Sequence, residues 1–108
     1  MYPGGRNVLG YCTLTVSSSA VSFADASPAM DAEGVWNSLS KPSGALITVE
    51  DDAIRWRADG TDPSSTEGHK NESGVPIVLI DWNYSEMLRD MTFIRVSTDA
   101  KLKITLFK

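Results

Sequence analysis

The stretch ALITVEDDAIRWR, residues 45–57, decides the fold that we expect. Residues 45–49 are predicted to form a strand buried on both faces, because Leu46 is apolar between apolar neighbours. Residues 50–52 are all acidic and are expected to form a tight turn with solvated carboxylates. In the second half, two pairs of side chains point to opposite sides of the chain, Ile54 with Trp56 and Arg55 with Arg57. The stretch therefore predicts a β-hairpin with one guanidinium-bearing face.

The same period of two recurs along the rest of the chain. Strands are predicted at 11–16, with Cys12, Leu14 and Val16 inward, and at 75–80, where Pro76 suits either a strand start or a sheet edge. Two further strands are predicted at 92–96 and at 101–107, the latter with Leu102, Ile104 and Leu106 inward. Six or seven short strands without a sustained helical period indicate an all-β fold. We expect an antiparallel β-sandwich or barrel, with a jelly roll among the options.

The remaining segments are predicted to connect these strands. Residues 31–40 favour a single helical turn, in which Trp36 packs as an anchor. Residues 58–74 contain no apolar side chain larger than alanine and are expected to be a long surface loop. Residues 81–90 are expected to be a loop or a short helix with Ser85 as its N-cap. The domain organisation that follows is an N-terminal arm over residues 1–10 and a single β domain over residues 11–108.

Length and charge exclude several classes of function. The chain has 108 residues with fourteen acidic and ten basic side chains, a formal net charge of -4, which is typical of one small soluble domain. Because its basic residues are scattered, we expect no nucleic-acid partner. The longest apolar run, 75–80, is far short of a bilayer span, so no membrane partner is expected. The single cysteine, Cys12, cannot form an internal disulfide and is expected to be a small buried residue in a protein that folds in the cytoplasm.

Candidate catalytic residues are nearly absent from the sequence. His69 is the single histidine, so a metal site with several histidines is excluded by count, and we expect His69 to be an exposed loop residue. The segment DGTD at 59–62 could contact a hard cation, but a solvated turn is the favoured interpretation. We therefore expect no enzyme activity, no catalytic residue, no metal and no cofactor.

Five side chains are candidates for an interaction surface: Arg55, Arg57, Trp36, Trp82 and Tyr84. The two arginines have two interpretations. They form a polar outer face that discourages edge pairing, or they pair with carboxylates of this chain's own acidic loop or of an adjoining subunit. The aromatic residues also have two. Trp56, Trp82 and Tyr84 could form a platform for a carbohydrate, whereas the favoured interpretation assigns them to the core and to an oligomer interface.

A family resemblance rests on several of these segments: ALITVE at 45–50, IRWRADGTDP at 54–63, Gly68 with His69, FIR at 93–95, and the alternating strand at 102–107. Over residues 44–108, this pattern resembles a small protein that is common in the structural gene clusters of tailed bacteriophages and prophages. The segment around Trp36 and the helix-like residues 85–91 are less typical of that family.

The resemblance implies a virion component and no catalytic residues. Our first hypothesis is a capsid decoration or cement protein on the capsid exterior, made in the host bacterial cytoplasm, that binds the major capsid protein and forms a homo-oligomer, with a trimer favoured, because many copies on a symmetric shell act together. A minor protein of the head-tail junction or tail is the near alternative. A carbohydrate-binding β domain is the alternative from another class, and a small hydrolase ranks last.

Overall fold

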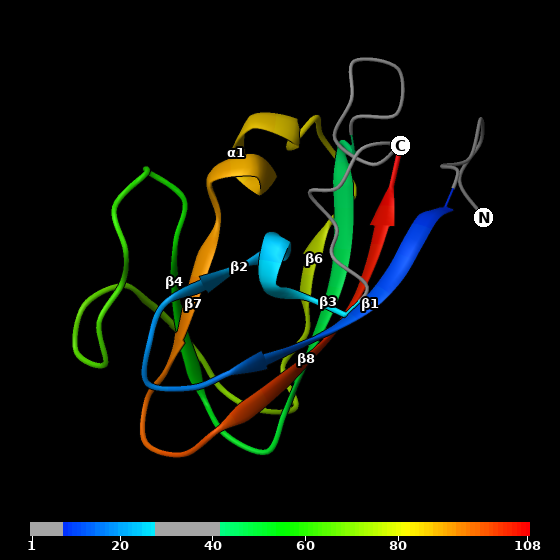
Figure 1. Ribbon diagram of the computed structural model, residues 1–108. Coiled ribbons are helices and arrows are strands. Elements are labelled where there is room, and N and C mark those ends of the chain that lie inside the picture. Colours follow the sequence, from blue (N-terminus) through cyan, green and yellow to red (C-terminus); the bar gives the residue numbers. More distant parts are fainter. Residues whose placement is uncertain (1–7, 28–41) are drawn as a thin grey trace.

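A computed structural model describes residues 8–27 and 42–108, and within them two antiparallel four-stranded sheets face each other (Figure 1). Sheet A contains, in spatial order, β1 (Val8–Val16), β8 (Ala100–Phe107), β3 (Gly44–Glu50) and β6 (Ile77–Leu79). Sheet B contains, in spatial order, β2 (Val21–Ser22), β7 (Thr92–Arg95), β4 (Ile54–Arg57) and β5 (His69–Asn71). A 3-10 helix, η1 (Phe23–Asp25), and one α-helix, α1 (Ser85–Asp90), complete these parts of the chain.

The pairing of the eight described strands follows a simple rule. The first strand pairs with the last, β2 with β7, β3 with β6 and β4 with β5, and every pair is antiparallel. The four pairs are then joined within the two sheets by the contacts of β3 with β8 and of β4 with β7. This is the topology of an eight-stranded jelly roll. The predicted all-β sandwich is therefore confirmed, and the jelly roll is the option that the chain adopts.

The core lies between the sheets and is built by the predicted alternation. Cys12, Leu14 and Val16 from β1 are buried there, as are the inward residues of β8, Leu102, Ile104 and Leu106. Sheet B contributes Phe93, whose ring meets Phe23 edge to face at a centroid distance of 5.6 Å. Cys12 is fully buried, so its predicted role as a small apolar core residue is confirmed, and this burial raises the pKa of its thiol to about 11.

The predicted hairpin over 45–57 is wrong, because β3 belongs to sheet A and β4 to sheet B. Residues 51–53 cross from one sheet to the other, with Asp51 in the left-handed region at φ +79°. The Asp52 carboxylate accepts hydrogen bonds from the backbone N–H groups of Ser97 (3.1 Å) and Thr98 (2.7 Å), and these bonds lower the pKa of that carboxyl. The acidic turn is thus hydrogen-bonded to the segment between β7 and β8, which also crosses from one sheet to the other. Alternation alone does not distinguish a crossing from a hairpin, because both place apolar residues inward.

The predicted burial of β3 on both faces is also wrong. Ala45, Ile47 and Val49 are buried, while Leu46 is 37% exposed and lies on the outer side of sheet A. An antiparallel sheet in a two-layer sandwich has one face in the core and one outside, and β3 follows that rule despite its apolar Leu46. Pro76, which suited either a strand start or a sheet edge, directly precedes β6, and β6 ends the strand order of sheet A.

Several predicted boundaries shift. Residues 8–10, which were predicted to belong to the N-terminal arm, are part of β1, where Val8 pairs with Phe107. The rest of the predicted arm, residues 1–7, and the predicted helical turn at 31–40 with Trp36 lie outside the described residues. The predicted loop over 58–74 contains β5. The predicted N-cap Ser85 is wrong, because Tyr84 occupies the N-cap position of α1. The backbone N–H of Ser85 donates a hydrogen bond to Asn83 Oδ1 at 3.0 Å. Within residues 8–27 and 42–108, no helix has the length and apolarity that a membrane crossing requires.

Candidate interaction surfaces

Arg55 lies on the outer side of sheet B and holds the loop that precedes β5. Its Nε donates to the carbonyl oxygen of Ser65 and its Nη1 to that of Gly68, each at 3.0 Å. Gly68 has φ +132°, and a Cβ there would lie 3.2 Å from the carbonyl oxygen of Trp56 and 3.1 Å from Cβ of Pro63. The loop therefore packs closely on β4, and Arg55 is engaged by backbone carbonyls of its own chain.

Arg57, on the same side of β4, pairs with a carboxylate of its own chain. Its Nε donates to Asp59 Oδ1 at 3.0 Å and its Nη2 to Asp59 Oδ2, and Asp59 Oδ1 also accepts from the Thr61 backbone N–H at 3.3 Å. The Arg57 hydrogen bonds lower the pKa of the Asp59 carboxyl, and the same contact raises the pKa of Arg57. This pairing is one of the two forms that the sequence predicted for the arginines.

The Arg57 pair involves the first carboxylate of the DGTD turn. A carboxylate that already accepts two guanidinium hydrogen bonds has less capacity for a hard cation. Among the residues that the structure describes, no group of three or more histidine, cysteine, aspartate or glutamate side chains is arranged to hold a metal ion.

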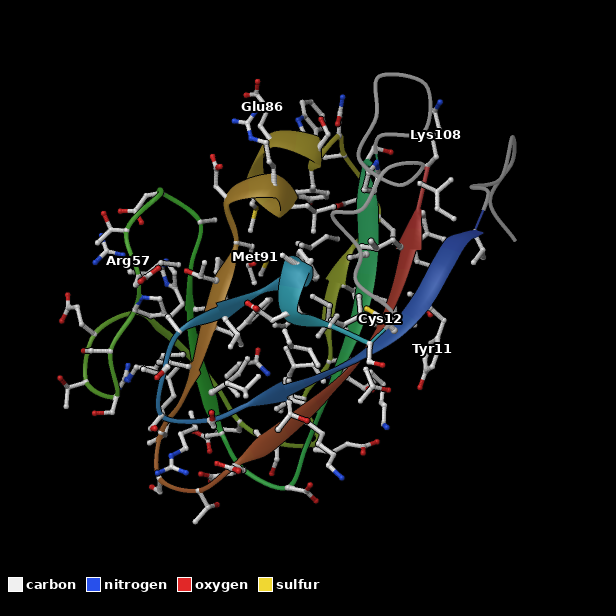
Figure 2. All side chains as sticks on the ribbon, viewed as in Figure 1. Tyr11, Cys12, Arg57, Glu86, Met91 and Lys108 are labelled. Carbon is white, nitrogen blue, oxygen red and sulfur yellow. The ribbon has the colours of Figure 1, made fainter. Side chains whose placement is uncertain are left out.

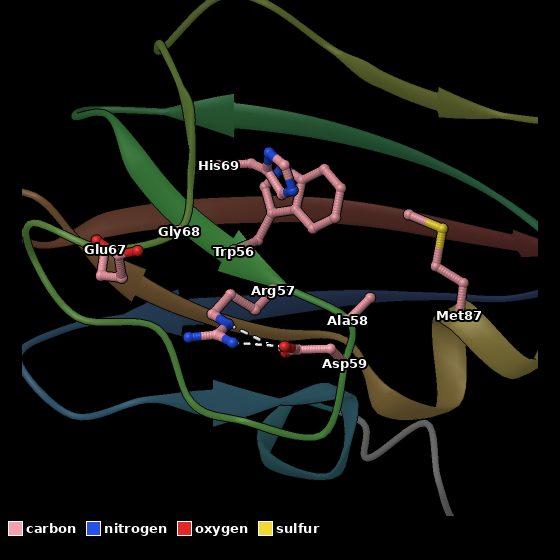
Figure 3. A pocket seen from close by; sticks show the side chains of 8 residues that line it. All are labelled: Trp56, Arg57, Ala58, Asp59, Glu67, Gly68, His69 and Met87. Carbon is pink, nitrogen blue, oxygen red and sulfur yellow. Dashed lines mark hydrogen bonds and ion pairs between the residues drawn. The ribbon is translucent and has the colours of Figure 1, made fainter.

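A hollow of about 560 Å³ opens beside Trp56, at the end of β4 and next to α1 (Figure 3). Trp56 pairs across the strands with His69, and the two rings stack with centroids 4.7 Å apart and planes tilted by 40°. The other walls are Met87 of α1 and the polar side chains of Arg57, Asp59 and Glu67. His69 is exposed, as predicted, but it belongs to a strand and not to a loop.

The aromatic candidates are not brought together in this hollow. Tyr84 packs partly buried against the core, and its hydroxyl donates to Asp81 Oδ1 at 2.6 Å. Trp82 is 74% exposed in the segment after β6. Neither side chain lines the hollow beside Trp56, so the predicted platform of the three rings is not assembled there.

The outer side of sheet A presents a second surface, which the sequence prediction missed. Tyr11 pairs with Thr105, Thr105 with Leu46, and Leu46 with Val78, so these four side chains form one row across four strands. Strand spacing makes this row roughly 14 Å long. Three of its members are apolar and exposed, at 56% for Tyr11, 37% for Leu46 and 48% for Val78. Figure 2 shows Tyr11 pointing away from the sandwich.

The apolar face, as we name the outward side chains of Val8, Tyr11, Leu46 and Val78, is unusual for this chain. All exposed large apolar side chains among the described residues lie on this face or in the segments on either side of β6, where Val75 and Trp82 are. Several exposed apolar side chains on one face mark an interaction site more often than apolar residues scattered singly over the surface do. The signal in the sequence was Leu46, whose apolar side chain at an outward position suggested a doubly buried strand.

Charged residues lie next to the apolar face on the same side of sheet A. Lys101 and Lys103 of β8 occupy the two rows beyond Thr105, and Glu50 pairs across the strands with Lys101. Lys103 Nζ donates to Thr13 Oγ1 at 3.4 Å. The outer side of sheet A thus joins an apolar half to a half of threonines and lysines.

No family model, no curated protein and no solved structure matches this chain.

Proposed function

We propose that this protein is a virion structural protein of a tailed bacteriophage or prophage, and that it decorates the capsid exterior by binding the major capsid protein. The observation that carries this proposal is the apolar face, an exposed row of apolar side chains on a stiff sheet. The jelly roll supports it, because viral capsid domains use this architecture, and so does the resemblance of residues 44–108. Fold alone would not be sufficient, since one fold serves many functions.

The energetics of the apolar face suit attachment to a repetitive shell. Burying exposed apolar area contributes about 25 cal/mol per Å², so covering the remaining surface of four side chains contributes on the order of a few kcal/mol. A single contact of this strength is weak after the cost of association. Copies that are linked to one another on the same shell act together, which multiplies the affinity without new contacts. We accordingly propose that copies cluster on the shell, with a trimer favoured.

The charges beside the apolar face favour one kind of partner surface. Lys101 and Lys103 carry positive charge on this side of a chain whose formal net charge is -4, and Glu50 supplies one negative charge. Two copies that met through this same face with their lysine halves opposed would bring lysines near lysines. An apolar strip bordered by carboxylates complements it better. We therefore propose that the chain attaches to the capsid through sheet A and that copies cluster through other surfaces.

Add-back to particles that lack the protein tests the proposal. The gene is deleted in the phage or prophage that encodes it, purified chain is mixed with the purified particles, and bound copies are counted after sedimentation. We expect saturable binding, and we expect Leu46→Glu to weaken it by at least tenfold, because a carboxylate would be buried against the shell. Lys70→Glu, an exposed change on β5 of sheet B, is the matched control and should bind normally. Absence of the protein from purified particles contradicts the proposal.

The position on the particle separates the two virion alternatives. Electron microscopy of particles with and without the protein is expected to show added density over the whole head surface. Density confined to the head-tail junction or to the tail would replace the decoration role by that of a minor attached protein. Sedimentation equilibrium of the purified chain measures whether copies form a trimer before they bind.

A further inference from the structure

The hollow beside Trp56 has walls that are held in place by the chain itself. Arg55 bonds the loop at Ser65 and Gly68, and this loop carries Glu67 at the rim. Arg57 fixes the carboxylate of Asp59 through two hydrogen bonds. Because these groups are positioned before any ligand arrives, less conformational freedom is lost on binding.

One wall of the hollow is aromatic and apolar. The indole of Trp56 is half-buried with the imidazole of His69 stacked on it, and Figure 3 shows its six-membered ring extending past the imidazole toward Met87. Ala58 adds a methyl group near the same ring. The volume of about 560 Å³ lies within the range of small-molecule sites, roughly 300 to 1,000 Å³.

The other wall is polar, and its net negative charge selects against anionic ligands. Two carboxylates, Asp59 and Glu67, accompany one guanidinium, Arg57, which already donates to Asp59 through Nε and Nη2. An anion would therefore meet excess negative charge. A small cation would be attracted by Glu67, but it would leave the apolar lining of Trp56, Ala58 and Met87 exposed to water.

We propose that this hollow binds a single uncharged saccharide ring. A pyranose has an apolar face of C–H groups, which would lie on the wall formed by Trp56 and His69. Its rim of hydroxyls both donates and accepts hydrogen bonds, which suits the carboxylate oxygens that accept and the polar nitrogens of the imidazole. This site is separate from the apolar face of sheet A and does not depend on the role in a virion.

Titration of the full-length chain with methyl glycosides of neutral hexoses and N-acetylhexosamines, followed by ¹H–¹⁵N NMR, tests this proposal. For a ligand of this size we expect a Kd of roughly 1 mM with at least one of these sugars, with shifts confined to residues around Trp56 and His69. Glu67→Gln is expected to weaken binding by about tenfold, since it removes a charged acceptor. Trp56→Phe, which keeps an aromatic ring in the partly buried position, should weaken binding while preserving the fold.

Trp82→Ala is the matched control, because it removes an exposed tryptophan that lies outside the hollow, and it should leave the Kd unchanged. The proposal is overturned if none of these sugars causes shifts at about 20 mM, a concentration far above the expected Kd. It is also overturned if Trp82→Ala loses binding while Glu67→Gln binds normally. Tighter binding of a uronic acid than of its neutral hexose is the third contradicting result. The capsid experiment is unaffected by each of these results.

Discussion

The outer faces of the two sheets differ in how their side chains are used. On sheet B, Arg55 and Arg57 stand out in the sequence, yet their guanidinium groups are engaged by Ser65, Gly68 and Asp59 of the same chain. On sheet A, the row through Leu46 exposes apolar side chains among the described residues. A charged surface residue is ordinary, whereas several exposed apolar side chains on one sheet face indicate a surface that binds another molecule. The contrast places the attachment surface that we propose on sheet A.

The largest expected effect compares the two sides of one strand of sheet A. Ile47→Ala removes a fully buried side chain and should lower the free energy of unfolding by about 2–5 kcal/mol, because it leaves a cavity between the sheets. Leu46→Ala, one residue away on the apolar face, should cost less than about 1 kcal/mol. Urea denaturation of both variants measures the difference. Equal losses would mean that Leu46 is covered in the free protein, and the apolar face would no longer be an open surface.

A second test concerns the loop that packs on sheet B. Gly68→Ala should cost about 1–3 kcal/mol, because φ +132° disfavours a side chain and the new Cβ would press on the Trp56 carbonyl and on Pro63. Gly60→Ala is the control, since it shares a positive φ but has no atom within 4 Å of its Cβ position, and about 1 kcal/mol is expected. The same urea experiment compares them. A loss at Gly60 as large as that at Gly68 would show that close packing of the loop is not the cause.

The third test asks whether Arg55 acts within the chain. Arg55→Ala should lower the free energy of unfolding by about 1–2 kcal/mol and speed proteolysis within residues 58–68, because two carbonyl oxygens lose their donor. Arg55→Lys should not restore protection, since an ammonium lacks the planar fork that reaches both oxygens. Normal proteolysis rates with reduced particle binding would instead assign Arg55 to an interface.

The smallest expected effect is the pH dependence that Asp52 gives to the crossings between the sheets. Hydrogen bonds led by that from the Thr98 backbone N–H lower the pKa of Asp52 in the folded state. Its contribution is therefore fully present above the unfolded aspartate value of about 3.9 and is lost as pH falls through the lower folded value. The Tm difference between the native chain and Asp52→Ala should be constant near neutral pH and shrink in acid. Asp62→Ala, at an exposed loop carboxylate, is the control, and a gap that does not change with pH would refute this role.

The alternation of apolar and polar residues predicted most of the inner face correctly. Cys12, Leu14 and Val16 of β1 and the inward residues of β8 are buried as expected, because a period of two leaves each strand with one possible core side. The local pattern failed where an outward position is apolar. Leu46 suggested a strand in the middle of a core, although it lies on the outside of sheet A.

Partners of polar side chains could not be predicted in the same way. The pairing of Arg57 with Asp59 follows from their closeness in sequence and was among the expected forms. The bonds of Asp52 to Ser97 and Thr98 join residues more than forty positions apart, and they exist because two crossings lie side by side. The hollow beside Trp56 likewise needs α1 to bring Met87 next to β4.

The positions of the strands, the residues that face the core and the all-β class can be predicted from local sequence. Each strand buries one side away from water, and the apolar residues along the strand show which side that is. The assignment of β3 and β4 to different sheets, the position of Leu46 in an exposed row and the engagement of Arg55 depend on contacts between distant segments. Those contacts form only when the two sheets pack against each other. This packing determines which outward side chains bond to groups of their own chain and which remain exposed to another molecule.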